Sequence, residues 1–103
     1  MVKKIEFYNE NIKVILQNSD LSPINYFYTD NTPEAIELVR KYDWFIYPYG
    51  DSNYVVAEFN GELIPFELEY AIKLLGFPPY TIIHINRVEI DCRKSNMQFF
   101  IGS

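Results

Sequence analysis

The sequence predicts an α+β fold in which two helices pack on one face of a mainly antiparallel β-sheet. Two stretches, residues 33–42 and 65–75, repeat apolar side chains at helical spacing. The segments around them are short and rich in aromatic and β-branched residues, which is typical of strands. No linker or low-complexity segment divides the 103 residues, so we expect a single compact domain over residues 1–103.

The first predicted helix has a clear beginning and one apolar face. Thr32 is a good N-cap, because its hydroxyl can accept a hydrogen bond from an amide of the first turn. Pro33 follows at the first helical position, where its missing N–H has no cost. The apolar stripe consists of Ala35, Leu38, Val39 and Tyr42. A strand is expected next, over residues 44–49, and Pro48 within it indicates a strand end or a sheet edge.

The second predicted helix begins at Pro65, again at the first helical position. Its apolar stripe consists of Leu68, Ala71, Ile72 and Leu75. Gly76 suits the left-handed residue that ends many helices, and the two prolines at 78 and 79 prevent continuation.

The remaining segments are predicted from alternation and turn residues. Strands are expected at 3–8, 12–17, 24–29, 54–59, 62–64, 80–86, 88–92 and 97–101. For 12–17 a short helix capped by Asn9 is the alternative, and residues 18–23 are expected to form a loop. The strongest hairpin signal is Asn60-Gly61, a pair that suits a type I′ turn. We also expect 88–92 to form a hairpin with 97–101.

Charge is unevenly distributed along the chain. The whole chain has a net charge of −5, but the segment 14–69 contains ten acidic residues and only two basic ones, a net charge of −8. This acidity argues against direct nucleic-acid binding, which requires neutralisation of phosphates. It favours attraction to a basic partner surface, although an ordinary solvated acidic face is the simpler interpretation.

Two further features concern the compartment. No apolar run approaches 18 residues, so we expect no membrane association. The single cysteine, Cys92, cannot form an internal disulfide, which favours a reducing cytoplasm. The abundance of Ile, Asn, Lys, Phe and Tyr, which have AT-rich codons, favours a low-GC bacterium or its phage as the source.

Candidate chemical groups are few. His84 is the sole histidine, and a surface or half-buried strand position is the simplest interpretation for it. We expect Cys92 to be a buried apolar residue. The carboxylate pairs Glu67/Glu69 and Glu89/Asp91 have no histidine at metal-ligand spacing, so solvated surface is predicted for both. The sequence therefore predicts no catalytic residue, no cofactor and no metal ligand.

The nine tyrosines are the strongest functional signal in the sequence. Tyrosine combines a large rigid contact area with a polar tip and is enriched at interfaces. Some of these rings could equally complete the core of a small domain. The predicted partner-binding residues combine tyrosines on strands with nearby acids: Tyr26, Tyr28, Asp30, Glu34, Glu37, Asp43, Tyr47, Tyr49 and Asp51.

These observations lead to a functional hypothesis. We expect a non-enzymatic domain that binds the basic surface of a protein partner. One concrete version is a phage- or mobile-element-encoded inhibitor of a nucleic-acid enzyme, similar in strategy to an anti-CRISPR protein and acting partly as a nucleic-acid mimic. The main alternative is a homo-oligomeric structural protein, such as a homodimer with tyrosines at a symmetric interface. A small ligand-binding protein or enzyme that uses His84, Cys92 or a tyrosine is a third possibility.

Overall fold

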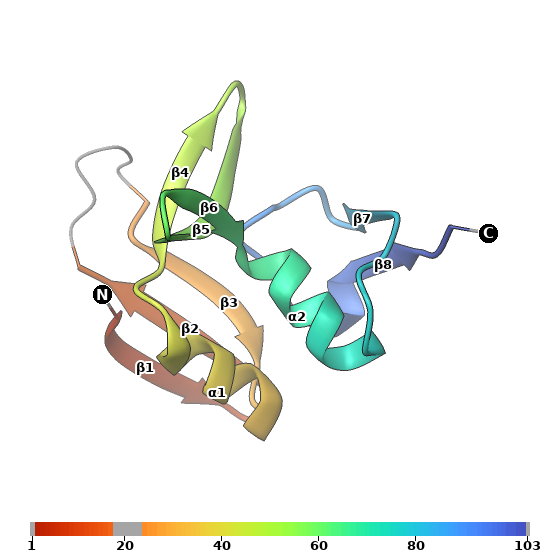
Figure 1. Cartoon of the computed structure of the whole chain (residues 1–103). Coiled ribbons are helices and arrows are strands. Elements are labelled where there is room, and N and C mark those ends of the chain that lie inside the picture. The colour runs from red at the N-terminus through yellow and green to blue at the C-terminus, as the bar shows by residue number, and fades with distance from the viewer. Residues whose placement is uncertain (1, 18–23, 103) are drawn as a thin grey trace.

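The structure, a computed structural model, describes residues 2–17 and 24–102 and has a mixed α+β architecture (Figure 1). The described strands are β1 (Val2–Tyr8), β2 (Asn11–Leu16), β3 (Tyr26–Asp30), β4 (Phe45–Tyr49), β5 (Ser52–Phe59), β6 (Glu62–Pro65), β7 (Thr81–His84) and β8 (Met97–Phe100). The helices are α1 (Pro33–Lys41), α2 (Phe66–Leu75) and the short 3₁₀ helix η1 (Lys94–Asn96).

The strands form three small antiparallel sheets rather than one. Their orders are β1-β2-β3, β4-β5-β6 and β7-β8. In Figure 1, α1 lies over the first sheet, α2 lies between that sheet and the β7–β8 pair, and the β4–β5 hairpin projects away from the rest. The mixed fold class is thus confirmed, whereas the placement of both helices on one face of a single sheet is not.

Several local predictions are confirmed. The Thr32 hydroxyl accepts a hydrogen bond from the Ala35 amide at 3.3 Å, so it caps α1. Asn60 and Gly61 have φ angles of 53° and 80°, as a type I′ turn between β5 and β6 requires. Pro48 lies in β4, which is an edge strand of its sheet. Residues 12–16 of the predicted strand 12–17 belong to β2 and not to a helix.

The aromatic part of the core is centred on Phe66, the first residue of α2. Its ring is fully buried, and the ring centroid lies 5.0 Å from that of Phe27 in β3 and 5.0 Å from that of Trp44. Trp44 in turn donates a hydrogen bond from its indole nitrogen to the Leu38 carbonyl of α1, at 3.1 Å. Side chains from both helices and from the first two sheets therefore share one core.

The second helix differs from its prediction in two respects. Pro65 is the last residue of β6, so the helix begins one residue later, at Phe66. Its buried side chains are Phe66, Tyr70 and Ala71, so Ala71 of the predicted stripe is confirmed, whereas Leu68, Ile72 and Leu75 are only partly buried. The prediction was wrong at these three positions because apolar residues occur on more than one side of this helix, and two faces show similar spacing.

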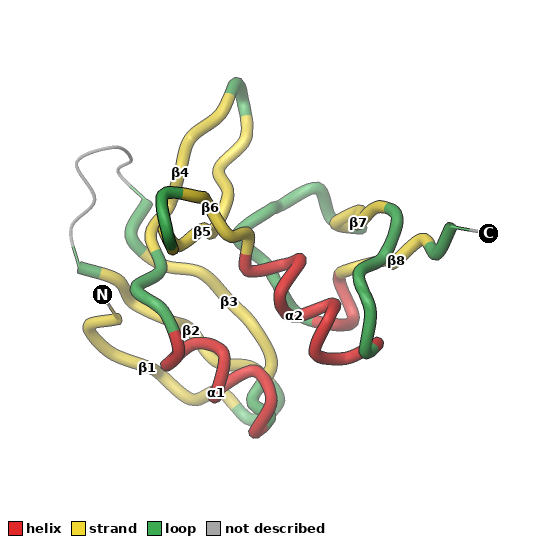
Figure 2. The backbone as a smooth tube through the Cα atoms, viewed as in Figure 1, coloured by secondary structure: helices red, strands yellow, loops and turns green. Residues whose placement is uncertain are grey.

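The C-terminal region departs most from expectation. The predicted hairpin of 88–92 with 97–101 is wrong, because β8 pairs with β7. The predicted strand 80–86 is shortened to β7, and residues 85–93 form a loop, which is drawn in green in Figure 2. This loop lies along the edge of β3: the Tyr28 amide donates to the Ile90 carbonyl at 2.8 Å, and the Cys92 amide donates to the Tyr28 carbonyl at 2.7 Å.

Two remaining expectations concern a loop and membrane association. The predicted loop over residues 18–23 lies outside the described residues. Within the described ranges, no helix combines the length and the hydropathy that a membrane crossing needs.

Candidate functional site

The β4–β5 hairpin brings three of the predicted partner-binding residues together. Tyr47 and Tyr49 lie on one face of β4, and Tyr47 is paired directly with Tyr54 of β5. The opposite face of the hairpin carries Ile46, which is buried in the core. Tyr49 is 71% exposed, and Asp51 lies exposed in the turn. We call the surface formed by Tyr47, Tyr49, Asp51 and Tyr54 the hairpin face.

Two other predicted tyrosines lie on a different sheet. Tyr26 and Tyr28 share a face of β3, and their rings meet edge to face with centroids 5.7 Å apart. The ammonium group of Lys13, from β2, lies 4.5 Å from the centroid of the Tyr26 ring. These tyrosines are therefore accompanied by a cation and not only by acids.

Predicted acids Asp30 and Glu34 line an open cavity of about 780 Å³ beside the start of α1. The Asp30 carboxylate accepts hydrogen bonds from the Tyr70 hydroxyl and, at 2.9 Å, from the Lys94 amide. Burial, together with this carboxylate, raises the pKa of Tyr70 well above its ordinary value. Asp30 thus has a structural role, since it connects β3 to α2 and to η1.

The last two predicted acids lie in the middle of α1 and just after its end. Glu37 is exposed on α1 and forms an ion pair with Lys73 of α2 at 2.9 Å. Asp43 is exposed in the connection between α1 and β4. The nine predicted residues therefore fall on several elements, and the hairpin group combines the exposed Tyr49 with the exposed Asp51.

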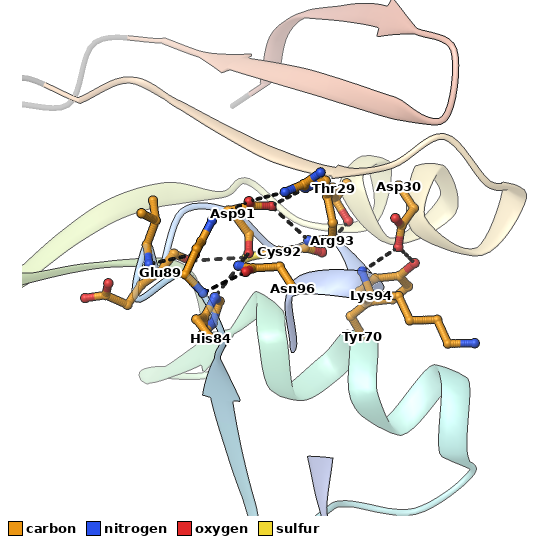
Figure 3. Close-up of polar contacts among 12 residues, drawn as sticks. Thr29, Asp30, Tyr70, His84, Glu89, Asp91, Cys92, Arg93, Lys94 and Asn96 are labelled. Atoms are coloured by element: carbon orange, nitrogen blue, oxygen red, sulfur yellow. Dashed lines mark hydrogen bonds and ion pairs between the residues drawn. The ribbon is translucent and has the colours of Figure 1, made fainter. Parts of the chain in front are cut away.

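Asp91 organises the loop that follows β7 (Figure 3). Its carboxylate accepts hydrogen bonds from the Arg93 side chain through two nitrogens, both at 2.7 Å, and from the Asn86 side chain at 2.9 Å. Burial opposes ionisation, but Arg93 and Asn86 hold the pKa of Asp91 below its ordinary value. Asp91 is only 7% exposed, so its prediction as solvated surface was wrong.

His84 is also more buried than predicted, with 7% of its surface exposed. Its Nδ1 lies 3.1 Å from the Asp91 carbonyl oxygen, and its Nε2 lies 3.3 Å from Oε2 of Glu67. The Nε2 contact has the distance of an ion pair but not the alignment of a hydrogen bond, and no other described residue partners this atom. Burial acts to lower the pKa of His84, but Glu67, the Asp91 carbonyl and Glu89 together outweigh it, and the pKa lies above the ordinary value.

His84 and Glu67 line an open hollow of about 350 Å³, which we call the Glu67 pocket. Its polar lining is Ser52, Tyr54, Glu67, His84, Arg87 and Glu89. Since Tyr54 belongs also to the hairpin face, the pocket adjoins that face. The pocket combines two carboxylates, one arginine and a buried imidazole with an aromatic wall.

Cys92 behaves as the sequence predicts. It is fully buried in the core, and burial raises the pKa of its thiol well above the ordinary value. Its carbonyl oxygen accepts a hydrogen bond from the Thr29 hydroxyl at 2.8 Å, so this segment is joined to β3 by side chain as well as backbone. Among the described residues, no three His, Cys, Asp or Glu side chains are grouped as a metal site.

No motif in the sequence indicates the Glu67 pocket. Glu67 and His84 are separated by 17 positions and belong to different elements, and no motif joins them. Alternation places His84 and Ile83 on opposite faces of β7, but it would favour burial of the isoleucine, whereas the structure buries His84 and leaves Ile83 49% exposed.

Comparison of the chain with protein-family models, with curated protein sequences and with solved structures found no match.

Proposed function

We propose that this chain is a protein-binding domain that docks on the basic surface of a partner through its hairpin face. The observation that carries the proposal is the hairpin itself. It projects from the rest of the molecule and presents Tyr47, Tyr49 and Tyr54 on one face, with Asp51 at its turn (Figure 1). Rigid aromatic side chains flanked by charge are typical of interface centres.

The charge distribution supports a basic partner. Among the described residues of the segment 14–69, six acids are exposed: Glu34, Glu37, Asp43, Asp51, Glu58 and Glu62. Acids on a partner-facing surface accelerate association with a positively charged one and make it sensitive to salt. A specific form of the proposal is inhibition of a nucleic-acid enzyme by partial mimicry of its substrate, as a phage- or mobile-element-encoded anti-CRISPR protein would act.

The test is an affinity experiment with matched variants. The tagged chain is incubated with a bacterial lysate at low and at moderate salt, and the recovered proteins are identified by mass spectrometry. We expect a basic nucleic-acid enzyme to be recovered at low salt and lost as salt rises. Replacing Tyr49 by Ser together with Asp51 by Lys should abolish this recovery.

The control variant is Glu6→Gln, which removes a carboxylate from β1, where it pairs with Lys4, and should leave recovery unchanged. The proposal is wrong if the double variant recovers the same enzyme as the wild type, or if no basic protein is recovered at either salt concentration.

A homo-oligomeric role is the second candidate, and one observation favours it. Apolar side chains are exposed along the β7–β8 pair, where Ile83, Ile85 and Ile101 have exposed fractions of 49%, 63% and 59%. Exposed apolar patches of this kind often mark contacts between copies. Light scattering over a range of concentrations tests it: a dimer that Ile85→Lys dissociates supports the role, and a monomer at high concentration excludes it.

A further inference from the structure

The Glu67 pocket contains two hydrogen-bond acceptors that face each other. A carbonyl oxygen can only accept, so the contact between His84 Nδ1 and the Asp91 carbonyl requires Nδ1 to carry the proton. In the neutral imidazole, Nε2 then presents a lone pair to Oε2 of Glu67, 3.3 Å away. This arrangement is unfavourable unless a positive group lies at or near the two atoms.

Two kinds of positive group can resolve this conflict. One is a proton on Nε2, which converts His84 to the imidazolium. The other is an external cation that pairs with Glu67 from the open side of the pocket. The charged groups around His84 are Glu67 from α2, and Glu89 and Arg87 from the loop. Arg87 is exposed and forms no ion pair with any described residue, so it leaves both carboxylates available.

We propose that the Glu67 pocket receives an arginine side chain of the partner protein. The guanidinium group would pair with the Glu67 carboxylate, near Glu89, and stack on the ring of Tyr54. This inference rests on the proposed function, because the pocket adjoins the hairpin face through Tyr54. A planar guanidinium suits the site better than an ammonium group, since it can form two parallel hydrogen bonds with a carboxylate and also lie against an aromatic ring.

The arrangement couples arginine binding to the protonation of His84. A cation paired with Glu67 replaces the charge that the imidazolium supplies, so the bound state favours neutral His84. Binding therefore releases a proton, and the affinity of the pocket for arginine increases as pH rises through the pKa of His84.

The experiment uses the full chain labelled with ¹⁵N and titrated with N-acetyl-argininamide at pH 6 and at pH 8. We expect saturable shifts of the amides of Ser52, Tyr54 and Glu67, with tighter binding at pH 8. Glu67→Gln should weaken binding roughly tenfold, because it removes a charge-assisted bidentate contact. Glu6→Gln should bind as the wild type does, and N-acetyl-lysinamide should bind more weakly than the arginine compound.

A second variant separates the pocket from folding effects. His84→Gln should still bind the arginine compound but lose the difference between pH 6 and pH 8. The inference is overturned if the wild type shows no saturable shift at these amides, or if Glu67→Gln with a native-like spectrum binds equally well. Neither result bears on the recovery of a basic enzyme by the hairpin face, so the two proposals fail separately.

Discussion

Replacing Asp91 by Ala should loosen the loop of residues 85–93, which runs beside β3 of the first sheet. The carboxylate is the acceptor for Arg93 and Asn86, and it lies where the loop runs beside β3. Without it, the donors of these two side chains lose their partner. The backbone hydrogen bonds between the loop and Tyr28 would remain as the main connection.

The expected cost follows from how exposed each partner is. Removing one member of a fully buried ion pair costs roughly 3–5 kcal/mol, because a charge is left without compensation. Here Asp91 is buried, but the side chain of Arg93 is 33% exposed and can turn toward water. We therefore expect a smaller loss of about 2 kcal/mol in the free energy of unfolding. Against a typical total of about 5–15 kcal/mol, this is readily measured.

Urea unfolding followed by tryptophan fluorescence measures this change, since Trp44 is the single tryptophan and is fully buried. The control is Glu37→Gln, which removes an exposed ion pair with Lys73 and should have no measurable effect. Amide exchange should show that the Cys92 amide, which donates to Tyr28, loses protection in the Asp91 variant. Equal stability of the two variants would refute the role that we assign to the Asp91 carboxylate.

The pH dependence gives an independent check on the same group. The pKa of Asp91 is lower in the folded chain than its ordinary value. The contribution of Asp91 to the free energy of unfolding is therefore present above the pKa of Asp91 in the unfolded chain. This contribution is lost as pH falls through the lower pKa of the folded chain. The difference in stability between wild type and Asp91→Ala should consequently shrink under acid conditions.

Three other predictions concern separate features. Folding raises the pKa of His84, so its contribution to the free energy of unfolding is complete below about pH 6.5 and is lost as pH rises through the folded pKa. The loss is about 1.4 kcal/mol for each unit between the folded and unfolded pKa values. Urea unfolding at several pH values should show that Glu67→Gln flattens this pH dependence. Gly61→Ala should cost about 1 kcal/mol in the same assay, because φ is 80° at this turn position. Cys92 should not react with a thiol reagent in the native chain and should react at the rate of unfolding, and rapid native reaction would contradict its burial.

Features determined by neighbouring residues were predictable from the sequence. Thr32 followed by Pro33 specifies a helix start through hydrogen bonding and a fixed φ, both of which act within one turn. Asn60-Gly61 specifies its turn because few residues tolerate positive φ at two successive positions. The short length of the apolar segment 12–17 likewise favoured a strand over a helix, and β2 includes residues 12–16.

Features that depend on distant partners were not predictable in the same way. Val88, Ile90 and Cys92 alternate as a strand would, yet the segment forms turns beside β3. A polar side chain explains the difference: the side-chain oxygen Oδ1 of Asn86 accepts a hydrogen bond from the Val88 amide at 2.9 Å. Such local hydrogen bonds compete with those of a strand ladder. The partition of strands among three sheets has the same origin, since periodicity indicates which face is buried but not which strand lies alongside.

The Glu67 pocket combines side chains that the core positions independently. Phe66, which precedes Glu67, is fixed between Phe27 and Trp44, so the first turn of α2 has little freedom to move. His84 is held from the other side by the Asp91 carbonyl, in a loop that is itself bonded to β3. Both acceptors are thus placed before any partner arrives, which reduces the entropy that a bound cation would have to offset. When His84 is neutral, the fold therefore holds two acceptors against each other, and a positive group from a partner would relieve this conflict.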